Sequence, residues 1–162
     1  MDFYKSIKDL KEYFLKFIKK VPSFGKSLIC IDDKINNELI KSVKNKNFYT
    51  YGTKLNANFL IKNVKQEKQF SKFDLLISLP NKKKVDLKNF KIPLLGIHNI
   101  RNSTAAIAVA YIVGISPSNI KRGLINFKGV QRRFNKIFSY NKIDFYDDYA
   151  CLLYTSDAAD DI

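Results

Sequence analysis

The 162-residue chain is poor in cysteine, in acidic residues and in long hydrophobic runs. Its two cysteines, Cys30 and Cys151, have no spacing typical of a metal site, so we expect a reduced, cytoplasmic protein with no metal ligands identifiable in this chain. No run of about 18 or more apolar residues occurs, which excludes a membrane-spanning helix. Residues 1–5 contain no apolar segment of the kind that marks a chain for export.

Arginine is scarce as well. The 29 basic residues comprise 25 Lys and 4 Arg, and with 15 acidic residues they give a net charge of +14. Such an excess can attract nucleic acid, but the lysines are scattered, and base and phosphate recognition favours the arginine fork. Lys, Asn, Ile, Phe and Tyr are abundant together. Their codons consist mostly or wholly of A and T, so an A/T-rich genome explains this joint excess. A solvated lysine surface is therefore favoured, with a small basic nucleic-acid-binding protein as the alternative.

Hydrophobic residues make up 46% of the chain, which is enough for a packed core. Their spacing predicts helices at 6–20, 36–43, 102–113 and 117–126, and strands at 27–31, 47–51, 59–64, 74–79, 85–90 and 142–146. The first elements follow a strand–helix–strand order that indicates a parallel sheet. The three strands after Gly52 are short and joined by polar turns, which predicts a small antiparallel sheet. The chain is therefore expected to be an α/β protein.

The stretch Gly96–Asn102 contains the single histidine, His98. Asn99 and Asn102 lie three residues apart where a predicted loop at 96–99 leads into a helix, so both amides can face one ligand. A carboxamide offers a donor and an acceptor side by side, which matches the edge of adenine. Two simpler roles stay open. Either asparagine can cap the helix, and a lone histidine beside a cap is often structural.

Two charged pairs follow. Arg132 and Arg133 are two of the four arginines, and this choice in a lysine-rich chain suggests a multi-point contact with phosphate or carboxylate. A surface pair at a domain hinge is the alternative. Asp147 and Asp148 close a predicted strand, where ligands gather in α/β folds, and a carboxylate there can accept hydrogen bonds from ribose hydroxyls.

In this order and spacing, the segments Gly96–Asn102, Phe127–Phe134 and Asp147–Ala150 resemble the G-x-H-N-x-x-N, F-x-G-x-x-R-R-F and D-D-Y-[AG] motifs of the Mur ligase family. Cys30–Asp33 is typical of the member that joins L-alanine to UDP-N-acetylmuramate in peptidoglycan precursor synthesis. The resemblance covers residues 1–150.

The resemblance implies an ATP-dependent ligase that activates the muramoyl carboxylate as an acyl phosphate, which the amine of L-alanine then attacks. It implies that His98, Asn99 and Asn102 lie at the adenine, that Arg133 contacts the ATP phosphates and that Asp148 binds the ribose hydroxyls. The implied partners are ATP, Mg²⁺, UDP-N-acetylmuramate and L-alanine, with no nucleic acid and no membrane. The ligase that recycles muramoyl tripeptide has similar motifs and remains the alternative.

The resemblance also divides the chain. Residues 1–129 correspond to the latter part of a central ATP-binding domain, and residues 130–150 to the start of a Rossmann-like C-terminal domain with its first strand. The family's Walker-type phosphate-binding loop, in which G-K-[ST] follows a strand and opens a helix, is not found. The family's magnesium and substrate residues lie upstream in relatives, so the chain is interpreted as an incomplete, inactive part of a ligase. Residues 151–162 lack Lys, Asn and Phe and resemble a translated transposase-end sequencing adapter, which indicates a non-native tail.

Overall fold

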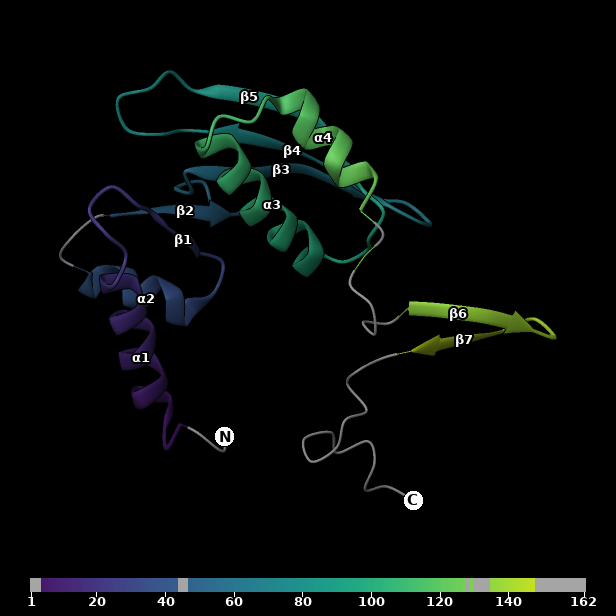
Figure 1. Ribbon diagram of the computed structural model, residues 1–162, viewed down its shortest axis with the longest axis horizontal. Coiled ribbons are helices and arrows are strands. Elements are labelled where there is room, and N and C mark those ends of the chain that lie inside the picture. Colours follow the sequence, from purple (N-terminus) through teal and green to yellow (C-terminus); the bar gives the residue numbers. More distant parts are fainter. Residues whose placement is uncertain (1–3, 44–46, 128, 130–134, 148–162) are drawn as a thin grey trace. The chain divides into compact units, whose positions relative to one another are not determined.

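The computed structural model describes residues 4–43, 47–127, 129 and 135–147 (Figure 1). Two compact units, Met1–Phe127 and Lys128–Ile162, divide the chain, and each is described by itself. The expected tail at 151–162 lies outside the described residues. The helices are α1 (Ile7–Lys19), α2 (Lys34–Ser42), α3 (Ile97–Ile112) and α4 (Pro117–Ile125). The strands are β1 (Ser27–Cys30), β2 (Phe48–Gly52), β3 (Phe59–Gln66), β4 (Ser71–Ile77), β5 (Val85–Ile92), β6 (Asn135–Tyr140) and β7 (Ile143–Asp147).

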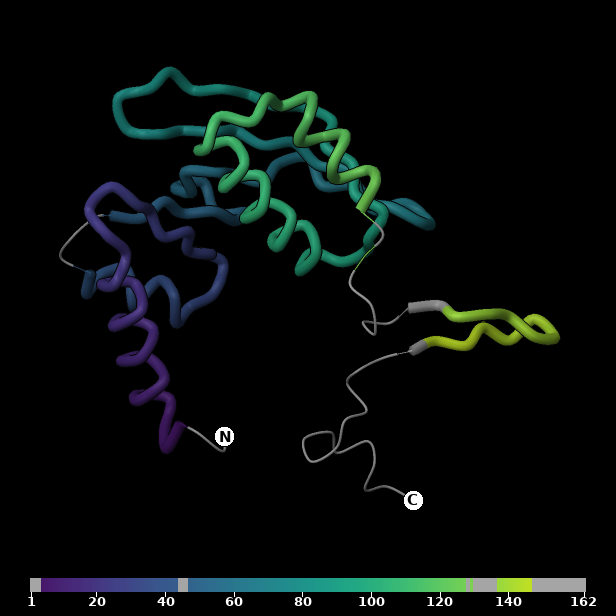
Figure 2. Tube along the Cα trace, viewed as in Figure 1, coloured from purple at the N-terminus to yellow at the C-terminus, as the bar shows by residue number. Residues whose placement is uncertain are grey.

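One mixed sheet of five strands, in the order β1-β2-β3-β4-β5, forms the centre of the first unit. β1 and β2 are parallel and lie side by side, joined through α2 (Figure 2). β3 is parallel to β2 over only two residue pairs, Tyr51↔Phe59 and Gly52↔Leu60. The chain therefore needs no crossover helix between them, because β3 begins beside the end of β2 and continues onward.

The remaining pairs, β3 with β4 and β4 with β5, are antiparallel. The α/β class, with a parallel part and an antiparallel part, is confirmed. The antiparallel strands continue the same sheet rather than forming a separate one, because β3 pairs with strands on both of its sides. The lysine-rich turn at 82–84 lies between β4 and β5, at the tip of a hairpin.

Helices cover both faces of this sheet, as the alternation along β3 shows. Phe59 and Ile61 are buried in clusters with residues of α3, whereas Leu60 packs in a cluster with Ile40 of α2. Successive side chains of a strand point to opposite faces, so α3 lies on one face and α2 on the other. α4 packs on β5, beside α3 (Figure 1). The main core thus lies between the sheet and the α3–α4 pair.

Side-chain caps fix the starts of three helices. The backbone N–H of Asp9 donates to Ser6 Oγ at 3.1 Å, which caps the start of α1. Asp33 Oδ1 accepts from the N–H of Asn36 at 3.0 Å, so α2 begins two residues before the predicted start. Ser116 Oγ accepts from the N–H of Asn119 at 3.4 Å at the start of α4.

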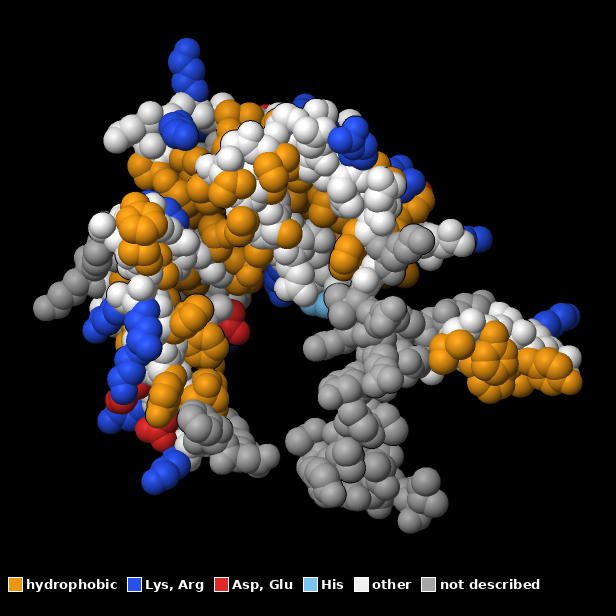
Figure 3. Space-filling model, viewed as in Figure 1, with side chains coloured by type: hydrophobic (Ala, Val, Ile, Leu, Met, Phe, Trp, Pro, Cys, Tyr) orange, Lys and Arg blue, Asp and Glu red, His pale blue; other side chains and the backbone are white. Residues whose placement is uncertain are grey.

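The apolar side of α1 is left exposed within the described residues. α1 has no buried residue, and Phe14 and Phe17 are 51% and 71% exposed. Figure 3 shows hydrophobic side chains gathered along this helix. Lys11 Nζ, 2.6 Å from Glu38 Oε2, ties α1 to α2. We call Ile7, Phe14 and Phe17 the α1 apolar face.

The second unit contains an antiparallel hairpin of β6 and β7. β7 is the strand predicted at 142–146, and β6 was not predicted. The rings of Phe138 and Phe145 stack across the pair with their centroids 4.4 Å apart. In the part of the chain that the structure describes, no helix has the length and apolar character needed to cross a membrane.

Candidate functional site

The predicted adenine-binding residues lie in the first two turns of α3. This helix begins at Ile97, so the prediction of a loop at 96–99 followed by a helix from 102 is wrong at this boundary. Residues three or four positions apart share a face of a helix. Asn102 is therefore a neighbour of both His98 and Asn99, and the structure brings these three predicted site residues together.

Neither asparagine caps the helix. The N-cap is Gly96, with φ of 92° and no side-chain hydrogen bond. Asn99 donates instead from Nδ2 to the carbonyl oxygen of Leu95 at 2.7 Å, which leaves its amide oxygen as an acceptor. The side chain of Asn102 is exposed and makes no hydrogen bond to another described side chain or backbone group. The capping interpretation is thus wrong, and the amide of Asn102 is available to a ligand.

The imidazole of His98 lies over Gly96. A Cβ placed on Gly96 would come within 2.6 Å of His98 Cε1 and 2.8 Å of Nδ1. Glycine is favoured at this position by its φ of 92°, and a side chain there would also displace the exposed ring. His98 is exposed, as expected for a side chain available to solvent or ligand.

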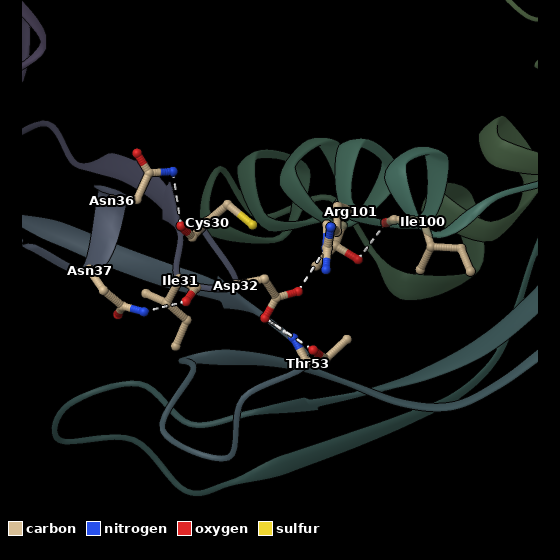
Figure 4. Close-up of polar contacts among 9 residues, drawn as sticks. Cys30, Ile31, Asp32, Asn36, Asn37, Thr53, Ile100 and Arg101 are labelled. Atoms are coloured by element: carbon tan, nitrogen blue, oxygen red, sulfur yellow. Dashed lines mark hydrogen bonds and ion pairs between the residues drawn. The ribbon is translucent and has the colours of Figure 1, made fainter. Parts of the chain in front are cut away.

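A polar cluster that the sequence did not predict lies at the carboxyl ends of β1 and β2 (Figure 4). Arg101 of α3 donates from Nε to Asp32 Oδ2 at 2.7 Å. Asp32 Oδ1 accepts from the backbone N–H of Thr53 at 2.8 Å and from Thr53 Oγ1 at 3.0 Å. The Asp32 side chain is 5% exposed and that of Arg101 35%. We call Asp32, Thr53 and Arg101 the Asp32 cluster.

The backbone around Asp32 is fixed by the start of α2. Asn36 donates from Nδ2 to the carbonyl oxygen of Cys30 at 3.0 Å, and Asn37 donates from Nδ2 to that of Ile31 at 2.6 Å (Figure 4). These bonds satisfy the carbonyl groups where β1 ends. These hydrogen bonds hold in place the backbone that carries the Asp32 side chain.

The charge of Asp32 is favoured by its partners. Burial alone would raise the pKa of this carboxyl, but the hydrogen bonds from Thr53 and the adjacent Arg101 guanidinium outweigh burial and hold the pKa below its ordinary value of 3.8. Asp32 is therefore an anion at neutral pH, paired with a cation from a helix that lies 69 residues further along the chain.

A signal for the Asp32 cluster was present in the sequence. Arg101 is one of only four arginines, and the argument applied to Arg132 and Arg133 holds for it equally. The predicted site residues Arg133 and Asp148 lie outside the described residues. Within the described ranges, no group of three or more His, Cys, Asp or Glu side chains is arranged to hold a metal ion.

Comparison with known proteins identifies relatives along most of the chain. Residues 1–110 match the Mur ligase middle domain. The chain is 66% identical over 150 residues to the UDP-N-acetylmuramate–L-alanine ligase of Pelagibacter ubique (strain HTCC1062), covering 93% of this chain and 32% of that protein. It is 37% identical over 150 residues to the ligase of the same name from Bartonella quintana (strain Toulouse), covering 92% of this chain and 32% of that protein. The chain thus spans about a third of the length of the curated relatives it matches.

Solved structures share the fold. MurF from Acinetobacter baumannii superposes with a TM-score of 0.69 at 21% identity, over 87% of this chain and 29% of that chain. The UDP-N-acetylmuramate-alanine ligase of Thermotoga maritima superposes with a TM-score of 0.65 at 20% identity, over 90% of this chain and 30% of that chain. The match over residues 1–110 and this shared fold establish that the chain belongs to the Mur ligase family.

Proposed function

We propose that the chain is part of a UDP-N-acetylmuramate–L-alanine ligase, an ATP-dependent enzyme of peptidoglycan precursor synthesis. The observation that carries this proposal is the 66% identity to the Pelagibacter ubique ligase over 93% of the chain. The substrates would be UDP-N-acetylmuramate, L-alanine and ATP, and the reaction would take place in the cytoplasm and serve cell-wall growth, cell shape and cell division. The ligase that recycles muramoyl tripeptide is the second candidate, and its different acceptor substrate separates the two.

Within this function, the start of α3 would bind adenine. The exposed amide of Asn102 and the free amide oxygen of Asn99 provide a donor and acceptors on one face of the helix. The exposed ring of His98 lies beside them. Arg133 would contact the phosphates of ATP, and Asp148 would accept hydrogen bonds from the ribose hydroxyls.

The remaining chemistry needs groups beyond the described residues. ATP would supply the phosphoryl group that activates the muramoyl carboxylate before the amine of L-alanine attacks it. The described residues do not fit a magnesium site, because no suitable cluster of ligands occurs among them, so Mg²⁺ would be held elsewhere in the ligase. A phosphate loop, in which G-K-[ST] follows a strand and opens a helix, is also missing from the described residues, because Gly25-Lys26-Ser27 leads into β1. We therefore expect this chain alone to show no alanine-dependent release of phosphate from ATP.

A graft into a complete ligase tests the proposal. Residues 1–150 would replace the matching segment of the Pelagibacter ubique enzyme, and phosphate release would be measured with UDP-N-acetylmuramate and L-alanine. We expect alanine-dependent activity, and Asn99→Ala should raise the KM for ATP about tenfold because an adenine contact is lost. Asn119→Ala is the matched control, since Asn119 is the third residue of α4 as Asn99 is of α3. A graft active only with muramoyl tripeptide would support the recycling ligase, and an inactive graft would contradict both.

We also propose the division of the chain into 1–129, 130–150 and a non-native tail at 151–162. The compact units Met1–Phe127 and Lys128–Ile162 support a boundary near residue 129. The alignment over 150 of the 162 residues supports the tail, since it leaves a length equal to that of the tail. Sequencing genomic DNA across the codon of Cys151 tests it. Genomic DNA that encodes the tail would show that these residues are native.

A further inference from the structure

The three residues proposed to bind adenine belong to α3, yet nothing in their own contacts fixes the end of that helix to the sheet. The side chain of Asn99 bonds to the carbonyl oxygen of the preceding Leu95, and the side chain of Asn102 makes no hydrogen bond to another described residue. Along its length, including these first turns, the helix is held by apolar packing, in which Ile100, Ile107 and Ala108 are fully buried. Apolar packing holds a helix against a sheet, but it is non-directional and sets the position of its end only loosely.

Arg101 supplies a directional contact at this point. It lies within one turn of His98 and next to Asn102, and its Nε–H reaches Asp32 Oδ2 at 2.7 Å. Asp32 is in turn held by both donors of Thr53, and Cβ-less Gly52 passes so close to it that an added Cβ would come within 2.5 Å of Oδ1. These contacts fix the position of the Asp32 carboxylate. The hydrogen bond to this carboxylate in turn fixes the position of the Arg101 side chain.

We propose that Asp32 and Arg101 are positioning residues, which fix the first two turns of α3 against the carboxyl ends of β1 and β2 and thereby set where Asn99 and Asn102 present their amides. This inference rests on the proposed adenine site. Asp32 need not touch the nucleotide, because its effect passes through Arg101. A lysine at position 101 would keep the charge but lack the Nε–H whose direction the contact uses.

The test uses the full 162-residue chain and two measurements by NMR. The first is backbone amide exchange at residues 97–104, compared with residues 105–112 of the same helix. The second is the ratio of the dissociation constants for GTP and ATP, obtained by titration with each nucleotide. The variants are Arg101→Met, Arg101→Lys and Asp32→Asn. A general loss of stability weakens the binding of both nucleotides by the same factor. The ratio of the two dissociation constants therefore responds only to a displaced adenine site.

Asp74→Asn is the matched control. Asp74 Oδ1 accepts from the N–H of Asn89 at 2.8 Å, and Oδ2 accepts from Nδ2 of Asn63 at 2.7 Å. Like Asp32 it is a carboxylate held by backbone and side-chain donors, but it makes no hydrogen bond to an arginine. Its neighbours Phe73 and Leu75 point toward α3, so Asp74 lies on the opposite face of the sheet.

We expect Arg101→Met and Asp32→Asn to speed exchange at residues 97–104 and to lower the preference for ATP over GTP about tenfold, the factor that one charged hydrogen bond supplies. Arg101→Lys should retain part of the preference, and Asp74→Asn all of it. Unchanged exchange in Arg101→Met would overturn the proposal, and so would faster exchange with an unchanged preference. An unsubstituted chain without a preference for ATP would instead contradict the proposed adenine site, and the exchange data would then decide whether the pair fixes α3.

Discussion

Replacing Gly52 by alanine perturbs the end of β2 in two ways that can be measured separately. Gly52 has φ of 146°, a value that residues with a side chain rarely adopt. The added Cβ would also come within 2.5 Å of Asp32 Oδ1, which is held by the N–H and the hydroxyl of Thr53. The backbone must therefore carry strain, and the carboxylate must leave its partners.

The magnitude follows from these two contributions. An unfavourable backbone conformation costs about 1–3 kcal/mol. Loss of hydrogen bonds to a charged group costs about 1.5–3 kcal/mol. We expect Gly52→Ala to lower the free energy of unfolding by about 3–5 kcal/mol in total, which is a large part of the stability of a small domain.

Urea unfolding followed by circular dichroism measures this loss, with two control variants. Gly114 also has a positive φ, 90°, but an added Cβ meets nothing within 4 Å, so Gly114→Ala should cost only about 1–2 kcal/mol of strain. Gly123 lies within α4 with open space around its Cα, and Gly123→Ala should stabilise by about 1 kcal/mol. Equal losses for Gly52→Ala and Gly114→Ala would refute the close contact with Asp32.

Three further outcomes are expected. Asn58→Ala should lower the free energy of unfolding by about 2–3 kcal/mol, because two hydrogen bonds are lost. Asn58 Oδ1 accepts from the N–H of the buried Thr50 at 2.9 Å, and Asn58 Nδ2 donates to the carbonyl oxygen of Ser78 at 2.9 Å. Urea unfolding measures this loss, with Asn58→Asp, which keeps the acceptor, as the control. Asp32 has a lower pKa in the folded chain than its ordinary value of 3.8. Its charge therefore stabilises the fold above pH 3.8, and this stabilisation is lost as the pH falls below that value. Acid titrations of the free energy of unfolding should show a smaller loss of stability for Asp32→Asn than for the unsubstituted chain, and identical titrations would contradict the pairing. Phe17→Lys should reduce self-association in sedimentation experiments with little change in stability, since Phe17 is 71% exposed on the α1 apolar face, and unchanged sedimentation would show that this face does not drive association.

The sheet strands were predictable because their local patterns agree with the fold. β1 is a short apolar run between turn residues. β4 alternates between buried and less buried positions along its whole length, although the predicted strand at 74–79 missed its first three residues. The capping pair of Ser6 and Asp9 likewise marks the start of α1 in the sequence. In each case the residues that determine the structure lie within a few positions of one another.

Two local errors have physical causes. The start of α3 was missed because Gly96 and Asn99 favour loops, whereas burial of Ile100 and packing of Ile97 on the same core hold these residues in the helix. β6 was missed because its connection to β7 is a two-residue turn with positive φ at Asn141 and Lys142, 49° and 64°. Asn-Lys is a weaker sign of such a turn than Asn-Gly.

The pairing of Asp32 with Arg101 could not be read from one sequence. The two residues are 69 positions apart, and neither the charge of Asp32 nor the scarcity of arginine specifies which partner each one has. Their contact depends on the order of the strands and on the face that α3 covers. The family motifs placed the adenine residues together, but this supporting contact required the fold.

The strands β1 to β5 lie in the sheet in the order in which the chain is synthesised. Each strand can therefore pair with the one that left the ribosome just before it, and the loops that close are short. The ion pair is different, because Arg101 follows Asp32 by 69 residues, or by roughly 3–14 s at about 5–20 residues per second. Until then the Thr53 donors are the partners of the carboxylate, and all the residues of the sheet, which ends at Ile92, are synthesised before the arginine that orients α3.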